Sequence, residues 1–347
     1  MAQKDDKRPH LWIKDLKEED PIRGLYLVRV KKTGITKKGS PFLSLTLGDR
    51  TGEVEAKVWE KVEVLSPLFS EGDIIYVKGY ASSYRNQIQV TLSDLKVPKD
   101  KTVNPDLFLE SSRRDTTEMM EALRKILKGI ENPFIRTLIE TFLSDRRFVQ
   151  RFKRAPAAKN FHHAYLGGLL EHTLSVCQMS ERITEHYPEL DRDLMLAGAF
   201  LHDLGKIKEL HFDRKIDYTD EGRLLGHIVL GVSLMDEKLA GLKDIPQELD
   251  LRLKHLILSH HGEFEFGSPK RPKFLEAYAL HLIDDLDAKM NGLSRFMERD
   301  KKEGDWTEFN NLFDRYFLKG KIPDVEKKGE QSLPEDDRQK VLFPQKP

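Results

Sequence analysis

Cysteine is almost absent from this chain: Cys177 is the single one among 347 residues. A lone cysteine excludes any disulfide bond within the chain, which is typical of proteins from a reducing compartment. Excess charge of either sign is missing as well, since 58 basic side chains stand against 58 acidic ones. The chain as a whole is therefore not a polycation, and only local clusters of charge can indicate a nucleic-acid partner.

Long apolar runs are the third absence. The opening residues Met-Ala-Gln-Lys-Asp-Asp-Lys-Arg form no apolar segment, and no stretch approaches the roughly 18 apolar residues that a membrane helix requires. We therefore expect a soluble, cytoplasmic protein without membrane contact. The length is sufficient for two or three domains.

The first hundred residues show the alternating pattern of short β-strands. The predicted strands cover residues 22–32, 42–47, 53–59, 74–82 and 87–92, with a short helical piece at 61–69. Three strands, a helix and two more strands is the order of an OB-fold, a small barrel that commonly takes single-stranded nucleic acid. The resemblance predicts an all-β OB domain at residues 16–97, after a polar segment at 1–15.

Basic and aromatic side chains of this domain are candidate contacts to phosphates and bases. Stacking of a base on an aromatic ring tolerates any sequence. The candidates are Lys31, Lys32, Lys37, Lys38, Phe42, Trp59, Tyr80, Tyr84 and Arg85. The alternative is that Phe42 and Trp59 belong to the barrel core and that the lysines form a solvated turn.

A linker is predicted at residues 98–115, and from Thr116 onward the apolar period becomes helical. We expect an all-helical bundle over residues 116–318, including a helix from about His163 to His186. Residues 319–347 are polar and contain several prolines, which predicts a flexible tail.

Seven side chains of metal-binding type are spread over five apolar segments of the helical region. In chain order they are His172, His202, Asp203, His227, His260, His261 and Asp284. An adjacent His-Asp pair in an apolar helix must find a partner or shift its pKa values. A cation such as Mn, Fe, Zn or Co accepts this mixture of ligands, and seven ligands exceed one tetrahedral site.

Helical geometry supports part of this set. His172 shares the buried face of Leu169 and Val176. The consecutive His260 and His261 can both reach a metal only if their helix ends there, and Gly262 supplies such an end. Asp287, three residues after Asp284, is positioned to hold a ligand imidazole by its second nitrogen. Each histidine taken alone is more often an ordinary core or surface residue, but the ordered set argues against coincidence.

The ordered set resembles the HD-domain superfamily of metal-dependent phosphohydrolases. In that superfamily the minimal site corresponds to His172, His202, Asp203 and Asp284, while the other three histidines match members that hold more than one metal. The resemblance implies two divalent ions, with Mn²⁺ favoured and Fe, Co, Mg or Zn compatible. Two such ions activate water and hold the phosphate oxygens.

Two residues of the His-Asp-Leu-Gly-Lys motif are expected to be catalytic. We place Asp203 between the metals and Lys206 beside the nonbridging phosphate oxygens, where its charge stabilises the transition state. The alternative for Lys206 is a cation at a helix C-terminus. At the entrance to the site, contacts to phosphate or base are expected from Arg154, Lys159, His162, His163 and Tyr165, unless these belong to an ordinary surface loop.

An OB domain followed by Ala-Ala-Lys-Asn-Phe-His-His-Ala-Tyr-Leu-Gly-Gly-Leu-Leu-Glu-His-Thr-Leu resembles the YhaM-type 3′→5′ exoribonucleases of bacteria, over residues 10–315. The resemblance implies metal-dependent release of nucleoside monophosphates from the 3′ end of single-stranded RNA, with single-stranded DNA as a further candidate substrate. It leaves a homo-oligomer open.

Two other functions remain as alternatives. The first is an HD phosphohydrolase of small or cyclic nucleotides, although the sequence after His-His is Gly-Glu-Phe-Glu-Phe-Gly rather than the Gly-Tyr-Pro that favours cyclic dinucleotides. The second is a non-enzymatic single-strand DNA-binding accessory factor, against which the complete ligand set argues.

Overall fold

The computed structural model describes residues 10–84, 87–98, 107–213 and 215–320. The chain divides into two compact units, the first ending at Gly292 and the second beginning at Leu293. Within the first unit, the barrel and the helical region each have their own hydrophobic core. Among the described residues, no helix has both the length and the apolar composition that crossing a membrane requires.

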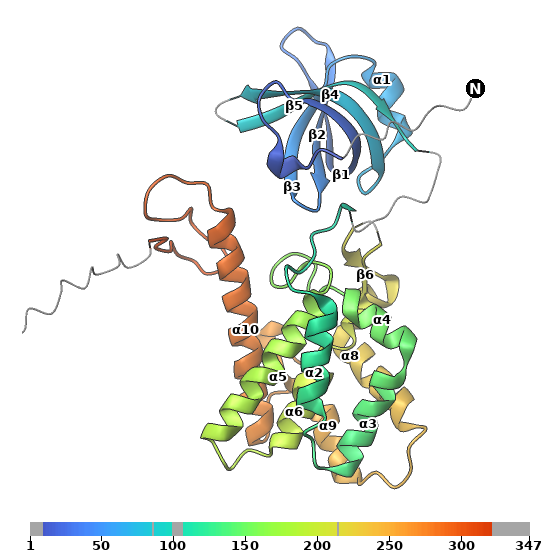
Figure 1. The fold of residues 1–347 in the computed structure, drawn as a ribbon, viewed down its shortest axis with the longest axis vertical. Coiled ribbons are helices and arrows are strands. Elements are labelled where there is room, and N and C mark those ends of the chain that lie inside the picture. Colours follow the sequence, from blue (N-terminus) through green and yellow to red (C-terminus); the bar gives the residue numbers. More distant parts are fainter. Residues whose placement is uncertain (1–9, 85–86, 99–106, 214, 321–347) are drawn as a thin grey trace, which may run out of the picture. The chain divides into compact units, whose positions relative to one another are not determined.

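Five strands form a closed barrel in the order β1-β2-β3-β5-β4 (Figure 1). Their bounds are β1 Pro21–Ile35, β2 Pro41–Asp49, β3 Gly52–Val58, β4 Ile74–Tyr84 and β5 Gln87–Lys96. Helix α1 (Val62–Leu65) and a 3₁₀ turn (Ser66–Leu68) lie between β3 and β4 in sequence. The predicted OB topology is confirmed.

The strand alternation seen in the sequence sorts side chains into the core. In β2, Leu43, Leu45 and Leu47 are fully buried, whereas the intervening residues face outward. Val54 and Val58 of β3 pair with Leu47 and Leu43 across the strands and are buried with them. Because strand residues alternate between faces, a single apolar set fills the barrel.

The barrel begins earlier than predicted. A 3₁₀ turn at Ile13–Asp15 precedes β1, and Ile13 belongs to the barrel core with Leu11 packed against it. Asp49, which is fully buried at the end of β2, accepts hydrogen bonds from the main-chain N–H of Ile13 at 2.8 Å and of Thr51 at 2.7 Å. The predicted boundary at residue 16 is therefore a few residues late.

Nine helices follow in the described part of the chain. They are α2 Thr116–Leu127, α3 Pro133–Ser144, α4 Arg146–Arg154, α5 Gly168–His186, α6 Arg192–Leu201, α7 Lys206–Glu209, α8 Asp220–Leu239, α9 Gln247–Ser259 and α10 Leu275–Arg299. Several begin at a side chain that accepts hydrogen bonds from the first free N–H groups. These N-caps are Asp115, Asn132, Asp145, Asp191 and Thr219.

Helices α5 and α6 lie at the centre of the helical core. Helix α5 contacts α2, α4 and α6, and α6 also contacts α9 (Figure 1). Every residue of α6 from Leu194 to Leu201 is buried. The helix can be apolar on all sides because neighbouring helices cover it, and this is the environment into which the His-Asp pair emerges.

The predicted helical domain is confirmed, and the structure differs from the prediction in three details. Strands β6 (Leu210–His211) and β7 (Asp217–Tyr218) form a small hairpin after α7. Helix α5 begins at Gly168 rather than near His163, because the preceding residues form an irregular loop. After α10, residues 300–320 contain no helix and are joined by bridges such as Trp306 to Leu318.

The Asp49 carboxylate predicts a pH-dependent stability of the barrel. Burial raises the pKa of Asp49, but hydrogen bonds from His10, Thr51 and Ile13 outweigh it and hold this pKa below its usual value. The stabilisation is therefore present above about pH 4 and is lost as the pH falls through the lowered pKa. We expect Asp49→Asn to destabilise the barrel by about 1–3 kcal/mol at pH 7.

Hydrogen exchange of β1 to β3 peptides, measured in the full chain, reports this change. The control is Asp94→Asn, because the half-buried Asp94 makes long ion pairs with Lys78 (4.0 Å) and Lys96 (3.9 Å). It also accepts from the main-chain N–H of Leu95 at 3.0 Å, which the oxygen of an asparagine can still do. Equal protection of the two variants at pH 7 would contradict the assignment.

Candidate metal centre

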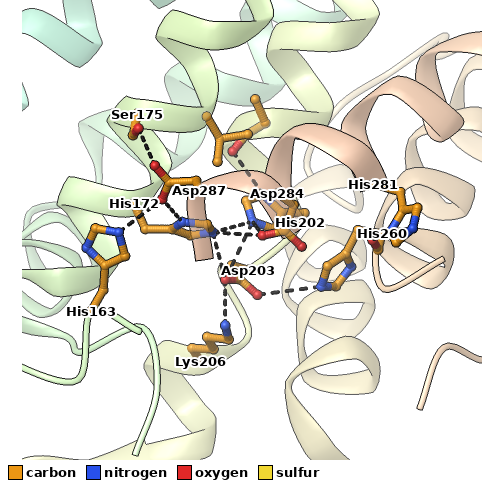
Figure 2. Close-up of polar contacts among 12 residues, drawn as sticks. His163, His172, Ser175, His202, Asp203, Lys206, His260, His281, Asp284 and Asp287 are labelled. Carbon is orange, nitrogen blue, oxygen red and sulfur yellow. Dashed lines mark hydrogen bonds and ion pairs between the residues drawn. The ribbon is translucent and has the colours of Figure 1, made fainter. Parts of the chain in front are cut away.

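Five segments of the helical domain bring their metal-type side chains to one place. Figure 2 shows those of His172, His202, Asp203, His260 and Asp284. In the first group, His172 Nε2 lies 3.1 Å from His202 Nε2 and 3.1 Å from Asp284 Oδ1. Asp203 Oδ2 lies 3.5 Å from the Nε2 atoms of both imidazoles. Two imidazole nitrogens and two carboxylate oxygens thus converge from α5, the end of α6 and α10.

A second group lies on the other side of Asp203. His227, His260 and His261 present ligand atoms that all fall within 4.8 Å of one another. Asp203 Oδ1 is 3.6 Å from His227 Nε2 and 3.6 Å from His260 Nε2. Asp203 therefore directs one carboxylate oxygen toward each group.

Unsatisfied polar atoms show that these residues fit a cation. Among the residues that the structure describes, Asp203 Oδ1, His227 Nε2 and His260 Nε2 are buried and have no hydrogen-bond partner. A buried polar atom without a partner costs on the order of 1–3 kcal/mol. Three such atoms around one point, two of them imidazole nitrogens and one a carboxylate oxygen, match the donor set that divalent transition metals accept.

The second ring nitrogen of each imidazole is anchored elsewhere. Main-chain carbonyls accept from Nδ1 of His202 (Ala199, 3.0 Å), His260 (Ile257, 2.8 Å) and His261 (Phe266, 2.9 Å). Carboxylates lie beside Nδ1 of His172 (Asp287, 2.7 Å) and His227 (Glu209, 3.1 Å). Because a carbonyl or carboxylate can only accept, each Nδ1 carries a proton and Nε2 is the nitrogen that faces the centre.

The charges of the centre are strongly coupled. Burial disfavours a protonated His172, but hydrogen bonds to Asp284 and Asp287 outweigh it and raise the pKa of His172 to about 10. Burial alone raises the pKa of Asp284, yet its hydrogen bond to His172 and the charges of His172, His202 and His260 lower it well below the usual range. At His261, burial lowers the pKa to about 3, so this ring is neutral near pH 7. The carboxylates stay ionised and available to a cation.

Similarity to known proteins agrees with this geometry. An HD domain model matches residues 169–289, and a model of the OB-fold nucleic acid binding domain matches residues 27–98. The 3′-5′ exoribonuclease YhaM of Bacillus subtilis is 40% identical over 283 residues, which cover 81% of this chain and 89% of that protein. The 3′-5′ exoribonuclease YhaM of Bacillus velezensis is 39% identical over 284 residues, or 82% and 89% of the two chains. The chain belongs to the YhaM family.

In this YhaM-family chain, Asp287 organises the side of the centre behind His172. Its Oδ2 lies 2.7 Å from His172 Nδ1 and 3.0 Å from His163 Nε2, and Ser175 donates to Oδ1. The Tyr165 hydroxyl is 2.9 Å from His163 Nδ1. The predicted support of an imidazole by Asp287 is confirmed, whereas no pattern in the sequence marks Ser175 as part of this network.

The same network changes the interpretation of two entrance residues. His163 and Tyr165 were expected to contact nucleic acid, but both are buried and hydrogen-bonded within the protein. Their position behind His172 arises because the loop before α5 turns inward at His163, whose φ is 45°. We therefore interpret His163 and Tyr165 as residues that support His172 through Asp287, and no longer as contacts to nucleic acid.

Other supporting residues were missed from the sequence. Glu209 accepts from both the main-chain N–H and the Nδ1 of His227. His281 Nδ1 lies 2.9 Å from the carbonyl oxygen of His260, and its ring fills the space beside Gly262, whose φ is 78°. Glu209 lies close to Lys206 in the sequence and His281 close to Asp284, but neither spacing is distinctive. No sequence signal therefore marked these two residues.

Gly205 of the motif is required for close packing. A Cβ at this position would meet the carbonyl oxygen of His227 at 1.9 Å. Because main-chain atoms cannot move aside as a flexible side chain can, only glycine lets the start of α7 lie against α8. This contact brings Asp203 and His227 to the same centre.

The remaining entrance residues and the predicted catalytic Lys206 differ in their surroundings. The ring of His162 is 5.9 Å from that of His172, and burial lowers the pKa of His162 to about 3. Lys206 Nζ is buried and lies 2.6 Å from Asp203 Oδ2. Lys159 pairs with Asp217 at 2.7 Å, and Arg154 is exposed at the end of α4.

In the barrel, the aromatic candidates are on the surface rather than in the core. The rings of Phe42 and Trp59 contact each other in a tilted arrangement with centroids 5.1 Å apart, and Trp59 is 48% exposed. Tyr80 and Tyr84 are likewise more than half exposed. The alternative that Phe42 and Trp59 form the core is therefore excluded.

The basic candidates of the barrel divide into two kinds. Lys32, Lys37 and Lys38 are exposed. Lys31 is different, because its Nζ donates to the carbonyl oxygens of Ser66 and Phe69, each at 2.6 Å. Its ammonium group thus satisfies carbonyl oxygens at the end of the short helical segment before β4. Arg85 lies outside the described residues.

A matched pair of carboxylates on α10 tests the role of Asp287. The Asp287 carboxylate accepts from three donors, on His163, His172 and Ser175. In Asp287→Asn the amide NH₂ must face at least one of these donors, so we expect Mn²⁺ affinity to fall about 10- to 100-fold. Asp285→Asn is the control, because Asp285 pairs with Lys289 at the surface. Equilibrium dialysis with metal analysis measures both, and an unchanged affinity in Asp287→Asn would refute the support role.

Proposed function

We propose that this protein is a metal-dependent 3′→5′ exoribonuclease that removes nucleoside monophosphates from single-stranded RNA, with single-stranded DNA as a secondary substrate. The observation that carries the proposal is the Asp203 carboxylate, whose two oxygens face two separate groups of imidazoles. Family membership with proteins named 3′-5′ exoribonuclease supports the same reaction and polarity.

The metal ligands in this proposal are the seven predicted side chains. His172, His202 and Asp284 would hold one ion, His227, His260 and His261 a second, and Asp203 would bind both. When bound, such ions lower the pKa of water and polarise the phosphodiester. We favour Mn²⁺, because mixed imidazole and carboxylate ligands suit it.

Lys206 would stabilise charge on the scissile phosphate. Its ammonium is buried beside Asp203, so its field acts in a region of low dielectric constant. A phosphoryl group that binds beside Asp203 would meet this ammonium directly. Positive charge aimed at oxygens that become more negative in the transition state lowers the barrier.

The barrel would hold the strand without reading its sequence. The contacting rings of Phe42 and Trp59 offer an aromatic surface, and Lys57 lies 5.7 Å from the ring centroid of Phe42. Exposed Lys32, Lys37 and Lys38 would bind phosphates on the adjoining hairpin, and Tyr80 and Tyr84 would extend the surface. Tethering the substrate in this way raises its concentration at the metal centre.

At the mouth of the metal centre, we retain His162, Lys159 and Arg154 as substrate contacts. His162 is the best-supported candidate of the three. Its ring lies next to that of His172, and its Nδ1 is buried without a hydrogen-bond partner in the described part of the chain. The domain organisation in this proposal is a barrel that ends near residue 97, a linker to 115 and a helical domain. We place the protein in the cytoplasm.

The reaction is tested with single-stranded RNA labelled at its 5′ end. We expect a ladder that shortens stepwise in the presence of Mn²⁺, and no shortening with Asp203→Ala or after treatment with EDTA, because both remove the bridging interaction. Gel electrophoresis follows the ladder, and restored cleavage after addition of Mn²⁺ to the EDTA-treated wild type is the control.

Other outcomes of this assay would refute the proposal. Hydrolysis of free or cyclic nucleotides with intact RNA would identify a small-nucleotide phosphohydrolase. Retention of the strand without cleavage at any metal concentration would identify a non-enzymatic binding protein. Immediate loss of the label from a substrate carrying it at the 5′ end would reverse the polarity.

Lys206→Met tests the electrostatic role. Removing one charge of this kind should lower kcat by about 10²- to 10³-fold while metal is still bound. Lys208→Met is the matched control, since Lys208 pairs with Glu237 at the surface. Single-turnover cleavage together with metal analysis separates the catalytic effect from loss of metal, and unchanged kcat in Lys206→Met would contradict the role.

A further inference from the structure

Two exposed phenylalanines follow directly after the second group of ligands. Phe264 and Phe266 lie in a 3₁₀ turn, and their exposed fractions are 58% and 62%. Large apolar side chains in water are unfavourable by about 25 cal/mol for each Å² left exposed. Their place beside a predicted catalytic centre gives a reason for this exposure.

The turn is tied to the metal-type histidines by the main chain. The Phe266 carbonyl oxygen is 2.9 Å from His261 Nδ1, and the N–H of Glu263 donates to the carbonyl oxygen of His261 at 2.9 Å. A further hydrogen bond at 2.9 Å runs from the N–H of Gly267 to the carbonyl oxygen of Phe264. The two rings are therefore carried by a segment whose position is fixed relative to His261.

An arginine completes the surface. The Arg271 guanidinium lies 4.9 Å from the ring centroid of Phe264 and is held by Glu263 at 2.7 Å. Lys270 and Lys273 are exposed on the same loop. Aromatic faces combined with a planar guanidinium and nearby ammonium groups are the features that bind unpaired bases and their phosphates.

We propose that Phe264, Phe266 and Arg271 form a stacking subsite for unpaired bases at the 3′ end of the RNA. The proposal rests on the exoribonuclease function and adds a second contact area, separate in sequence from the aromatic residues of the barrel. Stacking requires a free base face, so the subsite admits a single strand and discriminates against a paired end. It does not depend on base identity, because every base has a π-face.

An apolar surface can also bind another protein. The observations favour RNA because the turn is hydrogen-bonded to a metal-type histidine and because Arg271 and the two lysines exceed the two acids of the loop, Glu263 and Glu265, by one positive charge. A protein contact has no need of a position fixed on His261, whereas a substrate base must be held in register with the reacting phosphate.

The test crosses protein variants with altered RNA. Wild type, Phe264→Ala and Phe266→Ala are each given single-stranded RNA with all bases present, RNA lacking the bases of its two 3′-terminal nucleotides, or RNA lacking two bases farther inside. We expect each variant to lose roughly ten-fold in kcat/KM on intact RNA and to show no further loss on the RNA with the abasic end. Phe→Trp variants should restore cleavage, since they keep an aromatic face.

Two controls keep the outcomes separate. Bis(p-nitrophenyl) phosphate, which carries no base, reports the metal centre, so the ratio of kcat/KM for RNA to that for this ester should fall in the variants. Tyr187→Ala removes another exposed aromatic residue, 47% exposed at the C-terminal end of α5, and should leave RNA cleavage unchanged.

The proposal is overturned if the variants lose activity equally on intact and abasic RNA, or lose none. It is also overturned if light scattering shows that Phe264→Ala or Phe266→Ala changes the molar mass of the protein, because the turn would then be a protein interface. If wild type cleaves no RNA at all, the exoribonuclease function itself fails, which is a different result.

Discussion

The buried carboxylate of Asp203 is the interaction on which the rest of the centre depends. A single ionised group in an apolar core is costly, and here it is surrounded by His202, His227, His260 and Lys206. Its partners lie on both oxygens, so neither group of imidazoles is complete without it. A fold that buries this many titratable groups at one point is stable only when their charges are matched.

The helical bundle meets this constraint by fixing the imidazoles from behind. Each of the five proposed ligand histidines is held at Nδ1 by a carbonyl or carboxylate, which sets both its tautomer and its orientation. Three of these acceptors are main-chain carbonyls and therefore come with the helix ends and the turn themselves. The other two acceptors are the side chains of Asp287 and Glu209. The orientation of these imidazoles therefore depends on residues that do not themselves face the centre.

Binding and chemistry are divided between the parts of the chain. The barrel presents Phe42 and Trp59 as a contacting aromatic pair on its outer surface, while the helical domain carries the proposed ligands and the exposed turn with Phe264 and Phe266. Stacking of bases on either proposed surface would be independent of base sequence. Such a protein is suited to degradation, in which every nucleotide must be accepted in turn.

The sequence by itself determined the fold class and singled out the candidate ligands. Alternating apolar residues specify strands such as β2, and the order of His172, His202, Asp203 and Asp284 is informative because buried charges in apolar helices are rare. Only the tertiary structure decided the partners of the other polar side chains, both around the candidate ligands and in the barrel. His163 and Tyr165 turned inward, Lys31 bonded carbonyls, and Glu209 and His281 joined the centre. The physical reason is that periodicity records which face of an element is buried, whereas the partner of a polar side chain is set by loops and distant segments that no local pattern encodes.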